Sequence, residues 1–309
     1  MNNEQNIEGL TYRIKNALFG FIVGDALGVP YEFMPREKIN EIEFCVGGKH
    51  GMPVGVWSDD SSMMLCLVET YIENGLDFEL YSKKIIDWAS NGYMTPTGKP
   101  FGIGRTTFFS IMQLKKGISY LESGEKGENS NGNGSLMRVV PLAFILNNDE
   151  KRFKIIEEYS AITHAHKISK ISCSIYVVYL QELIKTNDKI KAYKNMQEII
   201  KNHYKQESEL IYFKGILEES IFDKDASSLS GLGYVISTLE VVLHSFINGN
   251  SFKNCVLNAI KIGNDTDTNA ALTGALAGYY YNELPESWVK KLLKYDFLEE
   301  TIDNFITKL

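Results

Sequence analysis

Hydrophobic positions recur at helical spacing along most of the chain. Apolar residues return every three or four positions, which is the period of one face of an α-helix. Helices are therefore expected over residues 10–28, 62–72, 79–91, 106–115, 136–147, 151–162, 168–186, 192–203, 207–222, 233–248, 252–262, 268–281 and 286–295. Alternating runs typical of strands are scarce, and residues 42–46 and 54–57 are either short strands or simply extended. The pattern predicts an all-α protein and argues against a doubly wound sheet.

Two of these helices are expected to lie in the interior. The helix over residues 10–28 carries Gly20, Gly24 and Gly28 four positions apart, a stripe that lets another helix approach closely. This spacing also occurs in membrane helix pairs, but Asp25 and the short length favour a buried helix of a soluble protein. The helix over residues 62–72 is apolar almost all round, which indicates a central position.

The most loop-like segment covers residues 123–134, which are rich in Gly, Ser, Asn and Glu. It is either a domain boundary or a ligand-binding loop, and both interpretations remain open. No low-complexity linker and no repeat divides the chain, so we expect a single domain over residues 1–309.

Composition and charge are those of an ordinary globular protein. The chain has 309 residues, of which 44% are hydrophobic, and its net charge of -7 argues against a general nucleic-acid or membrane-surface binder. No stretch approaches the roughly 20 apolar residues of a membrane span. The four cysteines have no CxxC spacing, so we expect reduced thiols and no zinc site. With a polar start that lacks a signal pattern, these features predict a cytoplasmic protein, by default a monomer.

An acidic cluster precedes the helix over residues 62–72. Ser58, Asp59 and Asp60 stand where a helix begins, and Ser and Asp are preferred N-caps, so a helix cap is one interpretation. Adjacent aspartates repel each other unless a positive charge lies beside them, so a metal site is the other interpretation.

A second acidic cluster leads into the helix over residues 268–281. It consists of Asp265, Asp267 and Thr268, and a helix cap is again one interpretation. The Asp-x-Asp spacing also resembles the start of a calcium loop, but the later glycine and the bidentate glutamate of an EF-hand are missing.

The two clusters are more informative together than apart. Both helices are apolar and rich in small residues, so both should be buried side by side, with four carboxylates at one place. Oxygen ligands alone select Mg²⁺, Mn²⁺ or Ca²⁺ over zinc, and two ions about 3.5–4 Å apart form a clamp for hydroxyl or phosphate oxygens. The predicted ligands are Ser58, Asp59, Asp60, Asp265, Asp267 and Thr268.

Further residues suit a nucleotide-like ligand. The run Ser130-Asn131-Gly132-Asn133-Gly134 exposes backbone N–H groups near a predicted helix start, which suits a diphosphate; an ordinary surface turn is the alternative. Tyr234 either stacks on adenine or is a core aromatic residue. His164 and His166 are two apart and do not share a helical face, so a histidine metal pair is not expected.

Several of these segments together resemble one family, the ADP-ribosylglycohydrolases. In chain order they are residues 24–28 with Glu32, 57–61, 102–106, 130–138 and 265–268, with Thr163-His164 as a weaker sixth. The likeness extends from about residue 12 to 282 and implies a single orthogonal all-α bundle. It also implies a binuclear Mg²⁺ or Mn²⁺ centre held by the six residues named above. Ser58 stands where the family usually has threonine, and it keeps the hydroxyl group.

The resemblance implies roles for other residues as well. Glu32, otherwise a solvated loop carboxylate, would ligate an ion or handle a proton. The run Gly102-Ile103-Gly104-Arg105 looks like a glycine turn whose backbone approaches the distal ribose, and His164 matches a position near the ligand phosphates. Gly102 stands where the nitrogenase-regulating branch has an aspartate. This leaves more of the catalytic work to Glu32, Asp59 or Asp60.

The implied activity is divalent-metal-dependent hydrolysis of the C1″ bond that joins ADP-ribose to a protein side chain, arginine or serine, with release of ADP-ribose. The implied partner is an ADP-ribosylated protein or an ADP-ribose-containing small molecule. Two alternatives remain: hydrolysis of a free ADP-ribose-like metabolite, and a non-catalytic ADP-ribose-binding or immunity protein. The intact aspartates and Glu32 argue against the last.

Overall fold

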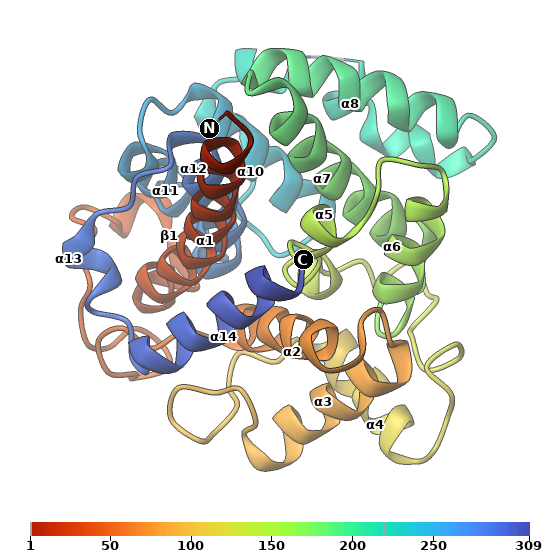
Figure 1. Ribbon diagram of the computed structural model, residues 1–309, viewed down its shortest axis with the longest axis horizontal. Helices are drawn as coiled ribbons and strands as arrows, with labels where there is room; N and C mark the ends of the chain where they lie inside the picture. Colours follow the sequence, from red (N-terminus) through yellow and green to blue (C-terminus); the bar gives the residue numbers. More distant parts are fainter. Residues whose placement is uncertain (1, 219) are drawn as a thin grey trace.

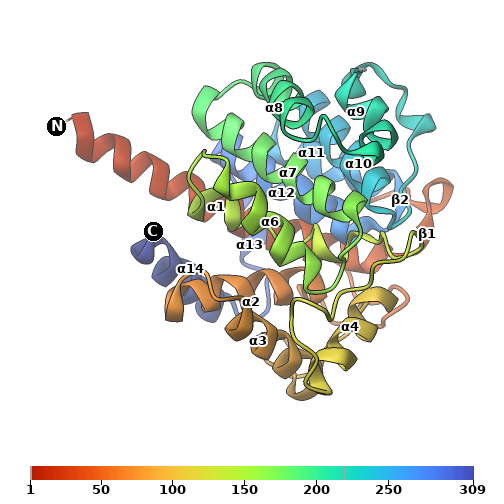
Figure 2. The ribbon, with the colours of Figure 1, turned by 90° about the vertical axis from the view of Figure 1, so that its right-hand side faces the viewer.

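Two long helices pack against each other at the centre of the molecule. A computed structural model describes residues 2–218 and 220–309, and in it α1 (Asn2–Gly28) lies along α12 (Thr266–Tyr281) (Figure 1). A Cβ added to Gly20 would overlap the carbonyl of Gly274, and one added to Gly24 would overlap that of Ala270. The glycine stripe therefore brings a second helix into backbone contact, as predicted. The N-terminal end of α1 extends beyond the body of the molecule (Figure 2).

The other helices surround this pair, and the all-α orthogonal bundle is confirmed. On one side lie α2 (Asp59–Asn74), α3 (Phe78–Asn91), α4 (Arg105–Lys115) and α14 (Tyr295–Lys308). On the other side lie α6 (Lys151–Ala161), α7 (Lys167–Thr186), α8 (Lys189–His203), α10 (Val235–Asn248) and α11 (Phe252–Lys261). The buried hydrophobic residues of both sides join in one continuous core. Among the described residues, no helix is both long and apolar enough to span a bilayer.

Short elements connect these helices. They are η1 (Val29–Tyr31), η2 (Arg36–Lys38), η3 (Asn133–Ser135), α5 (Leu142–Ile145), η4 (Ser208–Phe213), α9 (Lys214–Leu217), η5 (Ile221–Asp223), η6 (Ala226–Ser228) and α13 (Glu286–Val289). Two strands of two residues each, β1 (Met34–Pro35) and β2 (Gly263–Asn264), pair antiparallel, with Met34 opposite Asn264. This pair ties the segment after Glu32 to the segment before Asp265.

Three of the predicted helices are wrong in their extent. Residues 136–147 contain only turns and α5, because Pro141 lacks an N–H and keeps its predecessor out of a helix. Residues 207–222 are broken into η4, α9 and η5. Residues 286–295 contain α13 and only the first residue of α14, and Lys294, in the left-handed region at φ 57°, separates the two helices.

Of the two interpretations left open for residues 42–46 and 54–57, the short strands are wrong. Neither residues 42–46 nor 54–57 form a strand in the part of the chain that the structure describes; a single bridge joins Gly47 and Met52. The observed strands, β1 and β2, were not predicted, because two residues are too few to show an alternating pattern. Residues 123–134 are a loop, as expected, apart from the start of η3.

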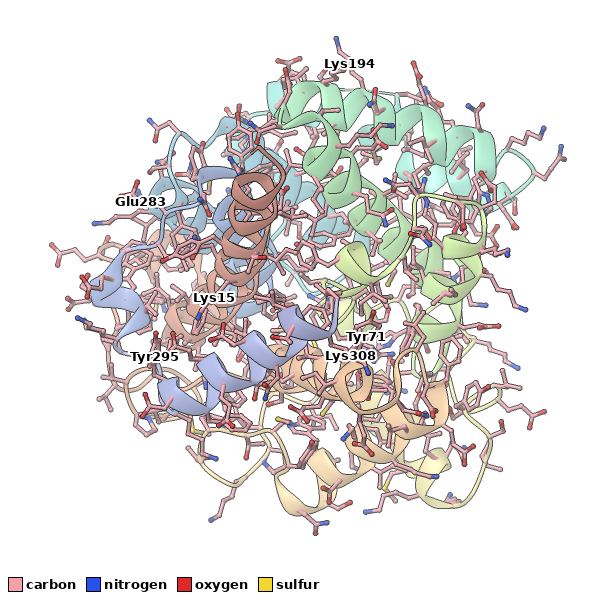
Figure 3. All side chains as sticks on the ribbon, viewed as in Figure 1. Lys15, Tyr71, Lys194, Glu283, Tyr295 and Lys308 are labelled. Atoms are coloured by element: carbon pink, nitrogen blue, oxygen red, sulfur yellow. The ribbon has the colours of Figure 1, made fainter. Side chains whose placement is uncertain are left out.

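Helix α14 was missed by the sequence pattern, yet it closes one side of the central pair. Lys15 of α1 lies 3.1 Å from a carboxylate oxygen of Glu299 and 2.8 Å from one of Asp303. Tyr71 of α2 packs edge-on against Phe305 at a ring separation of 5.6 Å. Figure 3 labels Lys15, Tyr71 and Tyr295 on this face.

The close packing of α1 on α12 predicts that Gly24→Ala destabilises the fold. The added Cβ meets backbone atoms of Ala270, which cannot move aside as a flexible side chain would. We expect the free energy of unfolding to fall by about 1–3 kcal/mol in chemical denaturation. Gly9 of the same helix has open space around it, so Gly9→Ala is the matched control. It should leave stability unchanged or raise it by up to about 1 kcal/mol. Equal effects of the two substitutions would contradict the packing.

Candidate active site

The first acidic cluster forms the start of α2. Ser58 is the N-cap: its Oγ accepts a hydrogen bond from the backbone N–H of Asp60 at 3.2 Å, so the helix-cap interpretation is confirmed for this residue. Asp59 and Asp60 occupy the first turn, where the helix dipole favours negative charge. Neither aspartate caps the helix with its side chain, so both carboxylates remain available for another purpose.

A buried aspartate that sequence reasoning assigned no role organises this helix start. Asp25 of α1 accepts hydrogen bonds from the backbone N–H groups of Ser58 and Ser61, each at 3.0 Å, and from the Ser61 hydroxyl at 2.5 Å. Burial raises the pKa of Asp25 to about 6 despite these hydrogen bonds. A lone aspartate inside an apolar, glycine-rich helix was the available signal.

The second acidic cluster forms the start of α12 without a side-chain cap. Asp265 stands at the N-cap position, but its carboxylate caps no N–H group of the helix. Its Oδ2 accepts a hydrogen bond from Asn133 Nδ2 at 2.7 Å instead. The helix-cap interpretation is therefore wrong for the Asp265 side chain.

The structure brings the two clusters together. Thr268 Oγ1 of α12 donates a hydrogen bond to Asp60 Oδ2 of α2 at 3.3 Å, and Ser58 Oγ donates to the same oxygen at 3.0 Å. Carboxylate oxygens of Asp25, Asp60 and Asp267 all lie within 4.8 Å of one another. A second group with the same limit consists of Glu32, Asp265 and Asp267. Asp267 belongs to both groups and so links them.

Within the described residues, the aspartates of this site have no ion-pair partner. Of the five aspartates at positions 25, 59, 60, 265 and 267, none forms an ion pair with Lys, Arg or His within the described residues. Burial, followed by repulsion from neighbouring carboxylates, raises the pKa values of Asp59, Asp60 and Asp267 well above the usual range. Burial and the charges of Asp265 and Asp25 raise the pKa of Glu32 to about 8.

One carboxylate oxygen of this cluster has no hydrogen-bond donor in the part of the chain that the structure describes. Asp60 Oδ1 is buried and has no hydrogen-bond partner among the described residues. A buried carboxylate oxygen with no donor is costly, and a cation would satisfy it. The surrounding donor set consists of carboxylate and hydroxyl oxygens only, which suits Mg²⁺, Mn²⁺ or Ca²⁺ and does not suit zinc.

A cavity of about 400 Å³ opens over this cluster. The acidic residues that line it are Glu32, Asp59, Asp60, Asp265 and Asp267, and the Thr268 side chain lies among them. The remaining lining includes Phe33, Gly102, Gly104, Arg105, Thr106, Thr107, Asn129, Gly132, Asn133, Gly134, His164, Leu232 and Gly233. The cavity therefore joins both helix starts to the glycine-rich loop that the sequence singled out.

The loop is held in place by Asn133 and Asn131, which act differently. Besides bonding Asp265, Asn133 Nδ2 donates to Thr238 Oγ1 at 3.0 Å, so it fixes the loop against α12 and α10. The side-chain amide of Asn131 bonds only to neighbouring protein groups in these contacts. Its Nδ2 donates to the Glu128 carbonyl at 2.9 Å, and its Oδ1 accepts from the Ser169 hydroxyl at 2.9 Å. Asn131 therefore anchors the loop and does not face the cavity.

Not every residue expected to bind ligand lines the cavity. Ile103, Ser130, Asn131 and Tyr234 lie outside the lining given above. Tyr234 is 40% exposed, so it is not a core aromatic residue. Its backbone bridges to Gly132, so the residue lies next to the loop.

The backbone explains why residue 102 is a glycine. Gly102 has φ +85°, a conformation that L side chains rarely adopt, and an added Cβ would overlap Asp59 Oδ1. An aspartate does not fit here without a local rearrangement, and Gly102 instead brings its backbone against Asp59.

A second residue that sequence reasoning missed is His50. Its Nε2 lies 2.5 Å from Glu32 Oε2, and its ring lies between Phe33 and Phe101, at ring separations of 6.0 Å and 5.2 Å. Burial, then the charge of Lys49, lowers the pKa of His50. No sequence signal points to this pair, because the two residues are 18 positions apart in irregular segments.

Comparison with known proteins identifies the family. The model of the ADP-ribosylglycohydrolase family matches residues 7–309. The chain belongs to the ADP-ribosylglycohydrolase family. As a member it is a hydrolase, as the resemblance implied.

Two relatives are similar in sequence to this ADP-ribosylglycohydrolase over most of their length, and a solved structure is similar in fold. The chain is 33% identical to the ADP-ribosylarginine hydrolase Tri1 of Serratia proteamaculans, over 96% of this chain and 78% of that protein. It is 26% identical to the ADP-ribosyl-[dinitrogen reductase] glycohydrolase of Rhodospirillum rubrum, over 91% of this chain and 90% of that protein. A solved ADP-ribosylglycohydrolase-related protein complex shares the fold, with a TM-score of 0.82 at 24% identity, over 97% of this chain and 99% of that chain.

The unbalanced carboxylates predict an unusual response of stability to charge removal. Asp60→Asn replaces one charge with an amide of the same shape, so without divalent ions the variant should melt at a higher temperature than the wild type. The difference should widen as pH rises above the ordinary carboxyl range. There, the unfolded chain loses the Asp60 proton while burial holds it in the folded chain, which costs the wild type stability. Thermal melts across pH test this.

A matched control separates this effect from a general rise in melting temperature on removal of one negative charge. Glu300→Gln removes one charge from an exposed position in the body of α14 and should not change the melting temperature appreciably. A destabilised Asp60→Asn variant at every pH would contradict the repulsion.

Proposed function

We propose that this ADP-ribosylglycohydrolase cleaves the bond at C1″ of the distal ribose in protein-linked ADP-ribose, with two Mg²⁺ or Mn²⁺ ions as cofactors, and releases ADP-ribose. The observation that carries the proposal is the cluster of uncompensated carboxylates lining one cavity. Two relatives, 33% and 30% identical, are named ADP-ribosylarginine hydrolases. We therefore propose arginine as the first linkage and serine as the second.

Six residues would hold the ions: Ser58, Asp59, Asp60, Asp265, Asp267 and Thr268. The orphaned Asp60 Oδ1 and the two carboxylate groups support Asp60, Asp265 and Asp267. Asp59 belongs to neither group but lines the same cavity. The hydroxyls of Ser58 and Thr268 contact Asp60. Bound divalent cations supply Lewis acidity and hold vicinal hydroxyl groups of a sugar. Asp25 takes no ligand role in the proposal, because N–H and O–H donors already occupy its oxygens.

The rest of the cavity would bind ADP-ribose along its length. The small residues Gly132 and Gly134 let the backbone approach a diphosphate, as at other glycine-rich anion sites. Gly102 and Gly104 line the cavity next to Asp59 and would lie along the distal ribose. Tyr234, exposed beside the loop, would stack on the adenine.

Glu32 is the residue that we propose for proton transfer. Both residues line the cavity, but one oxygen of Asp60 accepts from two hydroxyl donors and the other is assigned to an ion. Glu32 is instead held at the cavity by His50. As the C1″–N bond to arginine breaks, a water oxygen bonds to C1″ and one water proton passes to Glu32. The departing guanidine takes up that proton from Glu32, which returns the carboxylate to its starting state. Positive charge develops at C1″ in the transition state, and the surrounding carboxylates stabilise it.

The first prediction from this proposal concerns the divalent cation. Exhaustive chelation should abolish ADP-ribose release from an arginine-linked substrate, and Mg²⁺ or Mn²⁺ should restore it. Asp267→Ala should lose the divalent-dependent activity, because Asp267 belongs to both carboxylate groups. Asp296→Ala, on the outer face of α14, is the control. Full activity of Asp267→Ala, or of chelated wild type, would sink the metal assignment.

A second prediction concerns the bond that is cleaved and the acid–base residue. A panel of arginine- and serine-linked ADP-ribosyl substrates should yield ADP-ribose as the nucleotide product. Glu32→Gln should lower turnover by at least about a hundredfold, the usual effect of losing a general base. Inorganic phosphate or AMP as product would favour a hydrolase of another bond. Tight ADP-ribose binding with no turnover on any linkage would favour a non-catalytic reader.

A further inference from the structure

A buried arginine stands behind the ligand-binding loop with no carboxylate partner. Arg138 is buried, and its guanidinium donates to the Thr163 hydroxyl at 2.7 Å and to the carbonyls of Tyr159 and Gly134 at 2.7 Å and 3.2 Å. The described residues give it no acidic partner. A positive charge without a carboxylate partner is costly to bury, so the question is what Arg138 contributes through its contact with Thr163.

The Thr163 hydroxyl links this arginine to His164. A guanidinium only donates hydrogen bonds, so Thr163 Oγ1 must accept from Arg138. The one hydrogen of the hydroxyl is then free for its second partner, His164 Nδ1, at 2.7 Å. Nδ1 is therefore the acceptor, and the ring of a neutral histidine carries its hydrogen on Nε2. A hydrogen on Nδ1 instead would leave the hydroxyl hydrogen without a partner.

The rest of the surroundings agree with a neutral ring. Burial, followed by the charge of Arg138, lowers the pKa of His164 to about 3. The backbone of His164 is also fixed: its N–H donates to the Ser160 carbonyl at 2.8 Å, and its carbonyl accepts from the Ser160 hydroxyl at 3.0 Å. The ring is thus held by Thr163 at Nδ1 and by a fixed backbone.

The Nε2 side of this ring faces the loop of the cavity. His164 lines the cavity, and a Cβ added to Gly132 would lie 3.7 Å from Nε2. A Cβ added to Gly134 would lie 3.0 Å from the ring carbon Cε1. Only the small residues of the loop leave space beside this nitrogen, and that is the space in which the proposed function puts a diphosphate.

We propose that Arg138 and Thr163 are positioning residues that fix His164 as a neutral Nε2–H donor toward the cavity. The family resemblance already placed His164 near the ligand phosphates, and the relay explains how its ring would offer a hydrogen to a diphosphate oxygen there. The ligand part rests on the proposed function; the relay among the three side chains does not. His164 then contributes a directed hydrogen bond beside the acidic cluster without adding a titrating charge.

Nitrogen-15 NMR of histidine-labelled protein tests the relay in the absence of ligand. Wild type should show His164 with hydrogen on Nε2 only, with the signal assigned by its loss in His164→Gln. Thr163→Val keeps the shape but removes the hydroxyl, so the single tautomer should be lost, whereas Thr163→Ser should retain it. Hydrogen on Nδ1 in the wild type, or an unchanged tautomer in Thr163→Val, would overturn the relay.

Calorimetry with ADP-ribose tests the ligand part in the same proteins. Thr163→Val should bind about 3- to 10-fold more weakly, the usual value of one hydrogen bond, and Thr163→Ser should bind like wild type. In turnover assays the loss should appear in KM more than in kcat. Wild type with the expected tautomer but no affinity for ADP-ribose would overturn the ligand part together with the proposed function, while unchanged affinity in Thr163→Val would overturn the ligand part alone.

Substitution of the ring itself decides the matter if Thr163→Val does not fold. The amide nitrogen of His164→Gln reaches about as far as Nε2, whereas that of His164→Asn reaches only about as far as Nδ1. The glutamine variant should keep most of the ADP-ribose affinity and the asparagine variant should lose it by about 3- to 10-fold. Equal affinities of the two variants would overturn the assignment of the Nε2 donor.

Discussion

Buried aspartates that form no ion pair within the described part of the chain are the constraint around which the rest of this structure is arranged. Each carboxylate is costly to bury alone, and placing them within a few ångströms of one another adds repulsion. The fold holds them there through the backbone contact of α1 with α12, which puts Asp25 and Asp267 side by side. The close packing of these two helices therefore works against the repulsion between the carboxylates, and the divalent cations that we propose would reduce that repulsion.

The carboxylates divide by how their oxygens are satisfied. Asp25 is saturated by donors from the start of α2, so it supports the position of that helix. Asp60 has one oxygen held by hydroxyls and one with no partner, which suits a residue that faces an ion. Glu32 is held by His50 at the cavity, which suits a residue that exchanges protons with bound water. Environment, more than residue type, distinguishes these three roles.

Much of this site is readable in the sequence because the relevant patterns are local. Two acidic pairs each stand at the start of an apolar helix, and the glycine stripe of α1 predicts that another helix packs closely against it. The prediction that the two helix starts meet follows from these facts, and the hydrogen bond between Thr268 and Asp60 confirms it. The family likeness added what local chemistry does not contain, namely the kind of ligand.

The parts that escaped prediction depend on contacts between distant or irregular segments. His50 meets Glu32 through a loop with no periodicity, and the strand pair β1–β2 is too short to leave a pattern. Helix α14 begins directly after Lys294, which has a left-handed backbone conformation. A lysine is not a typical turn residue, so the sequence gives no sign of this break. The role of Asp25 was hidden for another reason: an aspartate in an apolar helix signals burial, but its partners Ser58 and Ser61 lie on a different helix.

The central claim is that the acidic cluster is a two-ion centre, and anomalous diffraction from crystals grown with Mn²⁺ tests it most directly. The assignment predicts two Mn²⁺ peaks between the starts of α2 and α12, bound by oxygens of Asp60, Asp265 and Asp267, with a Mn²⁺ oxygen contact at Asp60 Oδ1. Crystals of active protein that bind no Mn²⁺ at these residues, or bind it only elsewhere, would contradict it.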